Sequence, residues 1–375
     1  MKPPHPMRQP NEEPPRRGAR PLVRAARMAL YPRHVESTKA KLDRLIQYAR
    51  SHRRALILTH DNPDPDSIAA GVALAFLLER LAGVEALVAY GGIVGRAENR
   101  ALIRVLRLPV VPVSRVVFDE YDLICMVDTQ PEQGNHSLPA RHFPDVVIDH
   151  HPERPDSHLA PIADVGGPIG ATSTVVAEYF RASGLKMPAP IATALFYGIK
   201  ADTRDLGRQT TRQDVDAYLW LFPMADKDAL GDIEHPRLPL EYFRLYHTAL
   251  ERALVYDSAI IGDLGEIYAP DMVAEVAERF SFLEDVRFSL VFGEYDDALY
   301  FSLRICDRRV NAGRLIRDVI EARGGSAGGH GTMAGARVPL KGLSAAAKKR
   351  LREEIVLDFL KAFGVRTRKP RPIVE

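Results

Sequence analysis

Three short apolar runs in this chain end at or next to histidine or aspartate, and this repeated pattern constrains the fold more than any other feature. Run 55–58 is followed by Thr59 and then His60, run 123–127 by Asp128 and run 146–148 by Asp149. Runs of this length are typical of strands buried on both faces of a sheet. Because parallel strands end at the same edge of a sheet, we expect these side chains to meet there.

The segments around these runs predict helices and further strands. Apolar residues recur at helical spacing over 34–50, 67–81, 99–106 and 191–199, and a short strand is predicted over 85–90. Strands that alternate with helices indicate an α/β fold with a mostly parallel sheet and helices on both faces.

The turn after the first run is rich in metal-ligand side chains. His60, Asp64 and Asp66 stand there in an H-x-x-x-D-x-D pattern, and two prolines end the strand. This set favours a divalent cation, although a capped turn with solvated aspartates would explain the same residues. Asp202, after the helix 191–199, is the candidate for the last ligand. Oxygen ligands mixed with imidazole suit manganese best, with magnesium as the alternative.

The second half of the chain predicts a smaller α/β domain. Helices are expected over 214–221 and 240–255 with a loop over 223–239 between them, and strands follow over 258–261, 287–292 and 298–305. A length of 375 residues is comfortable for two domains. The expected parts are a flexible basic tail over 1–33, an α/β domain over 34–213, a helical connector over 214–256 and a C-terminal domain over 257–365.

A glycine-rich run over 324–335 contains His330. It lacks the Gly-Lys-Ser/Thr ending of a P-loop, so it does not predict nucleoside-triphosphate hydrolysis. Glycines let a backbone approach an anion closely, and Gly328, Gly329 and His330, with Arg304 upstream, predict a substrate clamp. A flexible loop without a ligand is the alternative.

Composition excludes several classes of protein. Hydrophobic residues make up 46% and charged residues 27%, and the net charge is only +2, so the chain as a whole is neither disordered nor strongly attracted to polyanions. Cys125 and Cys306 lie in apolar runs and are expected to be buried free thiols. No apolar stretch is long enough for a membrane span, so we expect a cytosolic protein with no membrane contact.

These motifs, taken in order, resemble the DHH phosphoesterase superfamily. The matching elements are His60-x-x-x-Asp64-x-Asp66, Asp128-Thr129, Asp149-His150-His151, Ser173-Thr174, Asp202-Thr203 and the Gly-Gly-His-x-x-Ala-Gly stretch of the family's associated C-terminal domain. The two-domain layout looks like the branch of short-oligoribonucleotide nucleases and phosphoadenosine-phosphate phosphatases. The Arg204-Asp205-Leu206-Gly207 stretch departs from the family's usual Gly and Phe.

The resemblance implies roles for the site residues. One divalent ion would be held by His60, Asp64 and Asp128, and a second by Asp66, Asp128, His150 and Asp202, with Asp128 bridging the two. Asp149 would orient His150, and His151 would face the scissile phosphate. Arg304 and His330 would grip the terminal phosphate or nucleotide of the substrate.

The resemblance also implies a function. We expect a two-metal phosphoesterase that releases mononucleotides from short RNA or removes a phosphate from phosphoadenosine phosphate, acting as a monomer or a homodimer. Alternatives are hydrolysis of a phosphoanhydride (polyphosphate or pyrophosphate), cleavage of cyclic dinucleotides, and a non-catalytic nucleic-acid-binding scaffold.

Overall fold

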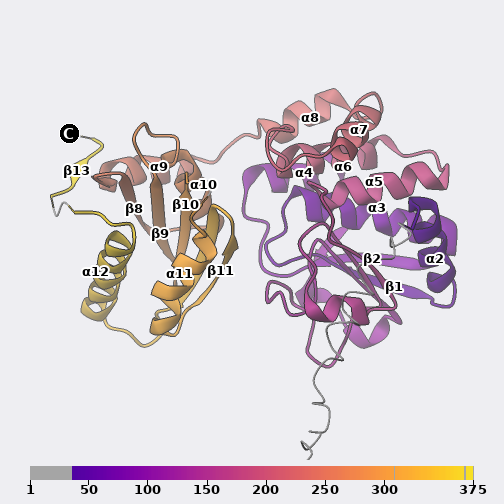
Figure 1. Cartoon of the computed structure of the whole chain (residues 1–375), viewed down its shortest axis with the longest axis horizontal. Helices are drawn as coiled ribbons and strands as arrows, with labels where there is room; N and C mark the ends of the chain where they lie inside the picture. The colour runs from indigo at the N-terminus through magenta and orange to yellow at the C-terminus, as the bar shows by residue number, and fades with distance from the viewer. Residues whose placement is uncertain (1–35, 308, 367–368, 375) are drawn as a thin grey trace, which may run out of the picture.

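The computed structural model describes residues 36–307, 309–366 and 369–374, and these form two lobes placed side by side (Figure 1). The predicted basic tail over 1–33 lies outside the described residues. No helix in the described part of the chain is both long and apolar enough to cross a membrane.

The first lobe is built on a six-stranded sheet in which every pair of neighbours is parallel. In spatial order the strands are β3 (Val110–Pro112), β2 (Glu85–Tyr90), β1 (Arg54–Leu58), β4 (Leu123–Val127), β5 (Val146–Asp149) and β6 (Ile162–Val165). The chain winds outward from β1 to β3 and then returns to place β4 on the other side of β1. This reversal opens a crevice at the carboxyl ends of β1 and β4, where sheets of this kind bind ligands.

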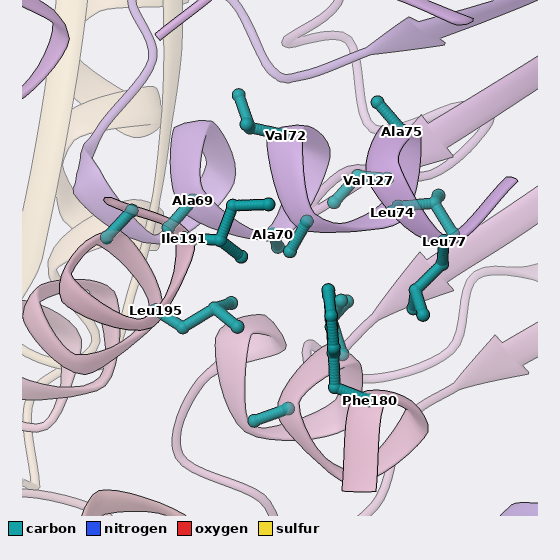
Figure 2. Packing of buried hydrophobic residues seen from close by; sticks show 14 of the residues in the cluster. Ala69, Ala70, Val72, Leu74, Ala75, Leu77, Val127, Phe180, Ile191 and Leu195 are labelled. Atoms are coloured by element: carbon teal, nitrogen blue, oxygen red, sulfur yellow. The ribbon is translucent and has the colours of Figure 1, made fainter. Parts of the chain in front are cut away.

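Helices cover one face of this sheet and form the main core. They are α2 (Thr38–Ala49), α3 (Pro65–Ala82), α4 (Ala97–Leu106), α5 (Thr172–Ser183) and α6 (Ala189–Asp202). Figure 2 shows α3 packed against helices α5 and α6, with Phe180, Ile191 and Leu195 against its alanines and leucines. The 3-10 helices η1 (Val113–Arg115) and η2 (Phe118–Glu120) cover part of the opposite face. The α/β fold with a parallel sheet is therefore confirmed.

The segment 214–256, predicted as a connector, is divided between the two lobes. Helices α7 (Arg212–Leu221) and α8 (Lys227–Glu234) bury apolar side chains in the first core, whereas α9 (Leu240–Arg252) packs in the second lobe. The predicted loop over 223–239 is wrong, because α8 lies inside it with Asp226 as its N-cap. The passage between the lobes thus falls between α8 and α9 (Figure 1).

The second lobe holds a seven-stranded mixed sheet. In spatial order its strands are β11 (Ser326–His330), β12 (Met333–Pro339), β10 (Ala298–Ile305), β9 (Phe288–Tyr295), β8 (Ala259–Glu266), β7 (Leu254–Tyr256) and β13 (Arg371–Pro372). Helices α9 and α10 (Asp271–Phe280) pack on one face, and α11 (Ala312–Ile320) and α12 (Ala345–Ala362) on the other. Strands β8 and β9 are parallel, and the other neighbours are antiparallel.

Two tight turns join strands in this lobe. The β9–β10 hairpin turns on Asp296 and Asp297 alone, and both have positive φ, as a two-residue turn of this kind requires. The glycine-rich run is not a loop, because β11 and β12 pair along it as an edge hairpin. Only glycine fits at position 329, since a Cβ atom there would lie 2.4 Å from the carbonyl oxygen of Met333.

The two cysteines are free, but they differ in exposure. Cys125 is buried in β4 as predicted, whereas Cys306 is exposed. The prediction for Cys306 is wrong because its apolar run ends at Ile305, the last residue of β10.

Close packing of α6 against α3 and α5 predicts the effect of adding one methyl group. A Cβ atom on Gly198 would lie 2.3 Å from Oγ of Ser173 and 3.2 Å from Cα of Asp66. We expect Gly198→Ala to lower the free energy of unfolding of the first lobe by about 1–3 kcal/mol, because the core is overpacked.

Gly231 in α8 provides the matched control, since nothing lies within 4 Å of its added Cβ atom. Gly231→Ala should stabilise the lobe by about 0.5–1 kcal/mol, as alanine does in a helix interior. Denaturant unfolding of both variants checks this. Equal shifts of the midpoint in the same direction would contradict the packing account.

Candidate metal centre

The first group of ligand-type side chains lies after β1 and β4. Nε2 of His60 is 3.6 Å from Oδ1 of Asp64 and 3.6 Å from Oδ2 of Asp128. Asp64 is also the N-cap of α3 and accepts the N–H of Ser67 through Oδ1. The start of α3 therefore fixes this carboxylate beside the imidazole.

Asp128 lies at the centre of the site, buried directly after β4. Its φ of 59° is the left-handed form that aspartate tolerates better than most residues. Its N–H donates to the carbonyl of Ile148, and its Oδ1 accepts the hydroxyl of Thr172 at 2.8 Å. Oδ1 lies 3.6 Å from Nε2 of His150, so the two oxygens of one carboxylate face two different imidazoles.

The second group joins His150 to carboxylates from α3 and α6. Nδ1 of His150 contacts the carbonyl of Ile169 at 3.2 Å, which leaves Nε2 as the nitrogen aimed into the site. That nitrogen is buried without a hydrogen bond and lies 3.2 Å from Oδ2 of Asp202, the last residue of α6. A buried imidazole nitrogen that makes no hydrogen bond and faces carboxylates fits a ligand of a cation.

Asp66 completes the second group from the first turn of α3. Its two oxygens accept the N–H groups of Thr172 and Ser173 at 2.7 Å each, where the positive end of α5 favours a carboxylate. Each oxygen keeps a lone pair for a further ligand.

The ligand-type atoms are close enough to share cations. Within each of three sets these atoms lie within 4.8 Å of one another, and the sets are His60, Asp64 and Asp128; Asp66, His150 and Asp202; and Asp128, Asp149, His150 and His151. Carboxylate oxygen and imidazole nitrogen without thiolate suit hard or borderline divalent cations. The residues present therefore fit divalent metal binding.

The pKa values of the candidate ligands also fit a cation site. Burial, with the charges of Asp66 and Asp64, raises the pKa of Asp128 well above its usual value. Burial and the same two carboxylates raise the pKa of Asp202 to about 8. Burial opposes the charge on His60, but Asp64 outweighs it and raises the pKa of His60 to about 9. The protein alone thus binds protons where a divalent cation would bind instead.

Asp149 orients His151 and not His150, which corrects the expectation from the sequence. Oδ1 of Asp149 accepts from both the backbone N–H and Nδ1 of His151, at 3.0 and 2.8 Å. Its other oxygen accepts Nε2 of Gln130 at 2.7 Å. Although burial opposes it, this pairing raises the pKa of His151 and lowers that of Asp149.

The predicted clamp residues lie in the second lobe. Arg304 is on β10, Gly328 and Gly329 are on β11, and β11 ends at His330, whose side chain is outside the described part. The hairpin points toward the first lobe, since Arg204 and Arg208 lie 3.7 and 3.6 Å from the sulfur of Met333.

Sequence reasoning missed two supporting residues. Thr172 donates its hydroxyl to Asp128 and accepts the N–H of His150, so it ties the two groups together. Gln130 is fully buried and holds Asp149. Gln130 lies two residues after Asp128 and Thr172 begins α5, but the sequence does not show their partners, which lie 19 to 44 residues away in the chain.

Comparison with known proteins gives relatives of both lobes. The chain is 34% identical over 310 residues to the uncharacterized protein MJ1633 of Methanocaldococcus jannaschii, covering 82% of this chain and 62% of that protein. It is 28% identical over 176 residues to a probable manganese-dependent inorganic pyrophosphatase of Lactiplantibacillus plantarum, covering 47% of this chain and 56% of the relative. The chain therefore spans less than two thirds of these relatives.

A solved structure shares the two-lobed fold. An exopolyphosphatase-related protein from Bacteroides fragilis superposes with a TM-score of 0.67 at 17% identity, covering 88% of this chain and 98% of that one. At this identity the likeness concerns the fold alone.

Two family models match consecutive parts of the chain. Residues 54–199 match the DHH family N-terminal domain, and residues 256–357 match the DHHA1 domain. The first range contains every residue of the candidate metal centre except Asp202, which lies three residues beyond it, and the second contains the glycine-rich hairpin. The chain therefore belongs to the DHH superfamily.

Proposed function

We propose that this protein hydrolyses phosphoester bonds in short oligoribonucleotides, or in phosphoadenosine phosphate, with two divalent cations. The observation that carries the proposal is the buried carboxylate of Asp128, whose oxygens face His60 on one side and His150 on the other. The second lobe brings a glycine-rich hairpin toward this centre, which favours a short anionic substrate over a long polymer.

His60, Asp64 and Asp128 would hold one cation, and Asp66, Asp128, His150 and Asp202 the other. When bound, the pair supplies a water nucleophile at neutral pH and neutralises charge on the phosphoryl oxygens. Manganese is the expected metal, with magnesium as the alternative.

His151 would act on the substrate directly. Because Asp149 engages Nδ1, the imidazole presents Nε2 as its other donor. The pairing with Asp149 raises the pKa of His151 against the effect of burial and so favours the protonated imidazole, which can donate a hydrogen bond to a phosphoryl oxygen or a proton to the leaving oxygen. Gln130 donates to the other oxygen of Asp149 and so helps to fix the orientation of the His151 ring.

Phosphoanhydride hydrolysis is the second candidate. It is favoured by the similarity to probable manganese-dependent inorganic pyrophosphatases, although each match covers less than half of this chain. Cleavage of cyclic dinucleotides, a homodimeric state and a cytosolic location stay predictions from the sequence.

A substrate panel tests the proposal. With manganese, the wild type should release mononucleotides from di- to pentaribonucleotides, and Asp128→Ala should lower kcat/KM at least about 100-fold, because both cation positions lose a ligand. The exposed Asp119, paired with Arg141, provides the control Asp119→Ala, which should leave the rate unchanged. Phosphate released from pyrophosphate or polyphosphate while RNA and phosphoadenosine phosphate stay intact would reject the phosphoester proposal in favour of the anhydride.

The raised pKa of Asp202 predicts how pH affects the metal-free protein. With a pKa of about 8 in the folded state and about 3.9 when unfolded, Asp202 binds more protons in the native state, so its contribution to stability is lost as pH rises from about 4 to 8. His60, with a folded pKa of about 9, acts in the same direction above pH 6.5. In EDTA, Asp202→Asn should therefore melt at a higher temperature than wild type at pH 8 and at nearly the same temperature at pH 4.

At pH 8, manganese should reverse the order of the two melting temperatures, so that the wild type melts higher than Asp202→Asn. At 100 times its dissociation constant the cation stabilises the wild type by about 2.7 kcal/mol, and Asp202→Asn should gain much less because a ligand is lost. Asp216→Asn is the control and should behave as wild type, because this half-buried aspartate of α7 pairs with Arg212. If Asp202→Asn and wild type melt at the same temperature both with and without manganese, Asp202 is not a ligand of the metal centre.

A further inference from the structure

The loop between β2 and α4, residues 91–96, contacts both lobes. Its Ile93 packs against the part of the second lobe's core that α9, α10 and the sheet form. At Gly95 the backbone runs very close to the first residue of α10, since an added Cβ atom would lie 1.5 Å from Oδ2 of Asp271. The second lobe is therefore docked on this loop of the first lobe.

Charges of both signs hold this docking contact. Nη2 of Arg96, at the end of the loop, lies 3.5 Å from Oε2 of Glu278, and Oε1 of Glu278 lies 3.2 Å from Nη2 of Arg204. Although burial opposes the charge on Arg96, the carboxylates of Glu278, Asp271, Glu275 and Glu98 outweigh it and raise its pKa. Guanidinium groups and carboxylates thus compensate one another here, and the contact serves to hold the lobes together.

The start of the loop is hydrogen-bonded to the turn that carries His60 and Asp64. Oδ1 of Asn62 accepts the N–H of Ile93 at 3.0 Å, and the N–H of Asn62 donates to the carbonyl of Gly91 at 2.9 Å. The φ of Asn62 is 57°, a left-handed form that asparagine tolerates better than most residues. Asn62 thus holds the loop with both its backbone and its side chain.

The peptide unit between Asp61 and Asn62 connects this contact to the imidazole of His60. Its N–H is the one that donates to Gly91, and its carbonyl oxygen lies 3.0 Å from Nδ1 of His60. Because a peptide unit is planar, its N–H and C=O turn together. The loop therefore helps to fix the His60 ring, whose Nε2 faces the two carboxylates of its group. Hydrogen-bond partners that orient a ligand in this way commonly set the affinity for the metal.

The ligands of the second group are held by other elements. Asp66 accepts N–H groups at the start of α5, and Nδ1 of His150 contacts the carbonyl of Ile169. Asp202 is the last residue of α6. A change in the loop 91–96 should therefore affect one cation position and leave the other nearly unchanged.

We propose that Ile93 and Asn62 are positioning residues for the cation held by His60, Asp64 and Asp128, and that this position binds its cation tightly only while the second lobe is docked on the loop 91–96. The inference rests on the cation binding in the proposed function. It adds to that function a dependence of one of the two cations on the second lobe.

A plain contact between the lobes is the competing interpretation of the loop. In that case, loss of the Ile93 side chain would loosen the lobes and lower kcat/KM, but both cations would bind as before. Coupling through Asn62 predicts instead that one cation binds more weakly. Measuring the two cation positions separately therefore distinguishes the interpretations.

The test measures manganese affinity with one cation position left at a time. In Asp202→Asn the cation held by His60 remains, and adding Ile93→Ala should raise its dissociation constant about 10-fold. In His60→Ala the other cation remains, and adding Ile93→Ala should change its dissociation constant by less than about twofold. Calorimetric titration with manganese chloride gives both values.

Two further variants keep the test specific. Ile373→Ala is the matched control, because Ile373 packs against the same part of the second lobe's core from outside the loop. Added to Asp202→Asn, it should leave manganese binding unchanged. Asn62→Gly keeps the left-handed backbone accessible and removes the acceptor of the Ile93 N–H, so it should weaken the His60 position as Ile93→Ala does.

Hydrogen exchange in EDTA gives a readout that needs no metal. The N–H groups of Asn62 and Ile93 are hydrogen-bonded while the second lobe is docked, so they should exchange at least about tenfold faster in Ile93→Ala than in wild type. Exchange in Ile373→Ala should equal that of wild type. Asn62→Asp keeps an acceptor oxygen and should keep the N–H of Ile93 protected.

The outcomes separate this inference from the proposed function. Equal affinities of Asp202→Asn with and without Ile93→Ala would overturn the coupling, and so would equal weakening of both cations. If short RNA and phosphoadenosine phosphate are not hydrolysed while the affinities shift as expected, the proposed function alone is rejected. A wild type that binds no manganese would overturn both.

Discussion

The carboxylate of Asp128 is the group on which the rest of the metal centre depends. It is buried between two imidazoles and surrounded by the charges of Asp66, Asp64 and further aspartates, which together raise its pKa. Side chains with the same charge are not buried together unless something opposite in sign compensates them. In the protein alone, protons and the histidines partly fill this role. A pair of divalent cations would fill it more completely, and this links the stability of the first lobe to its chemistry.

The fold brings this centre together by converging strand ends and helix starts. The reversal of strand order between β1 and β4 puts His60 and Asp128 at one crevice, and the first turn of α5 receives Asp66 with its N–H groups. Gly198 lets α6 lie close to these elements, so that Asp202 arrives at the end of α6 beside His150. Contacts of Arg204 with Glu278 and with the sulfur of Met333 then join the two lobes and bring the glycine-rich hairpin beside the turn that follows α6.

Much of this arrangement could be predicted from the sequence, because it follows from periodicity and strand ends. The strands 85–90 and 123–127 have the predicted bounds, and the predicted ligand residues do converge. Side-chain partners could not be predicted in the same way. Nδ1 of His150 contacts the carbonyl of Ile169, so Asp149 pairs with His151 instead. This arrangement depends on a loop 19 residues further along the chain, which the local sequence does not reveal. The sequence predicts a loop where β11 forms, since glycines have low strand propensity and only pairing with β12 makes the run extended.

The central claim is that one carboxylate is shared by two cations, and counting bound manganese tests it most directly. Equilibrium dialysis of the wild type at pH 8, with bound metal quantified per chain, should give two manganese ions. Asp128→Asn, which keeps the shape of the side chain and removes its charge, should weaken both positions together. Two tightly bound ions in Asp128→Asn, or a single ion in the wild type, would contradict the account.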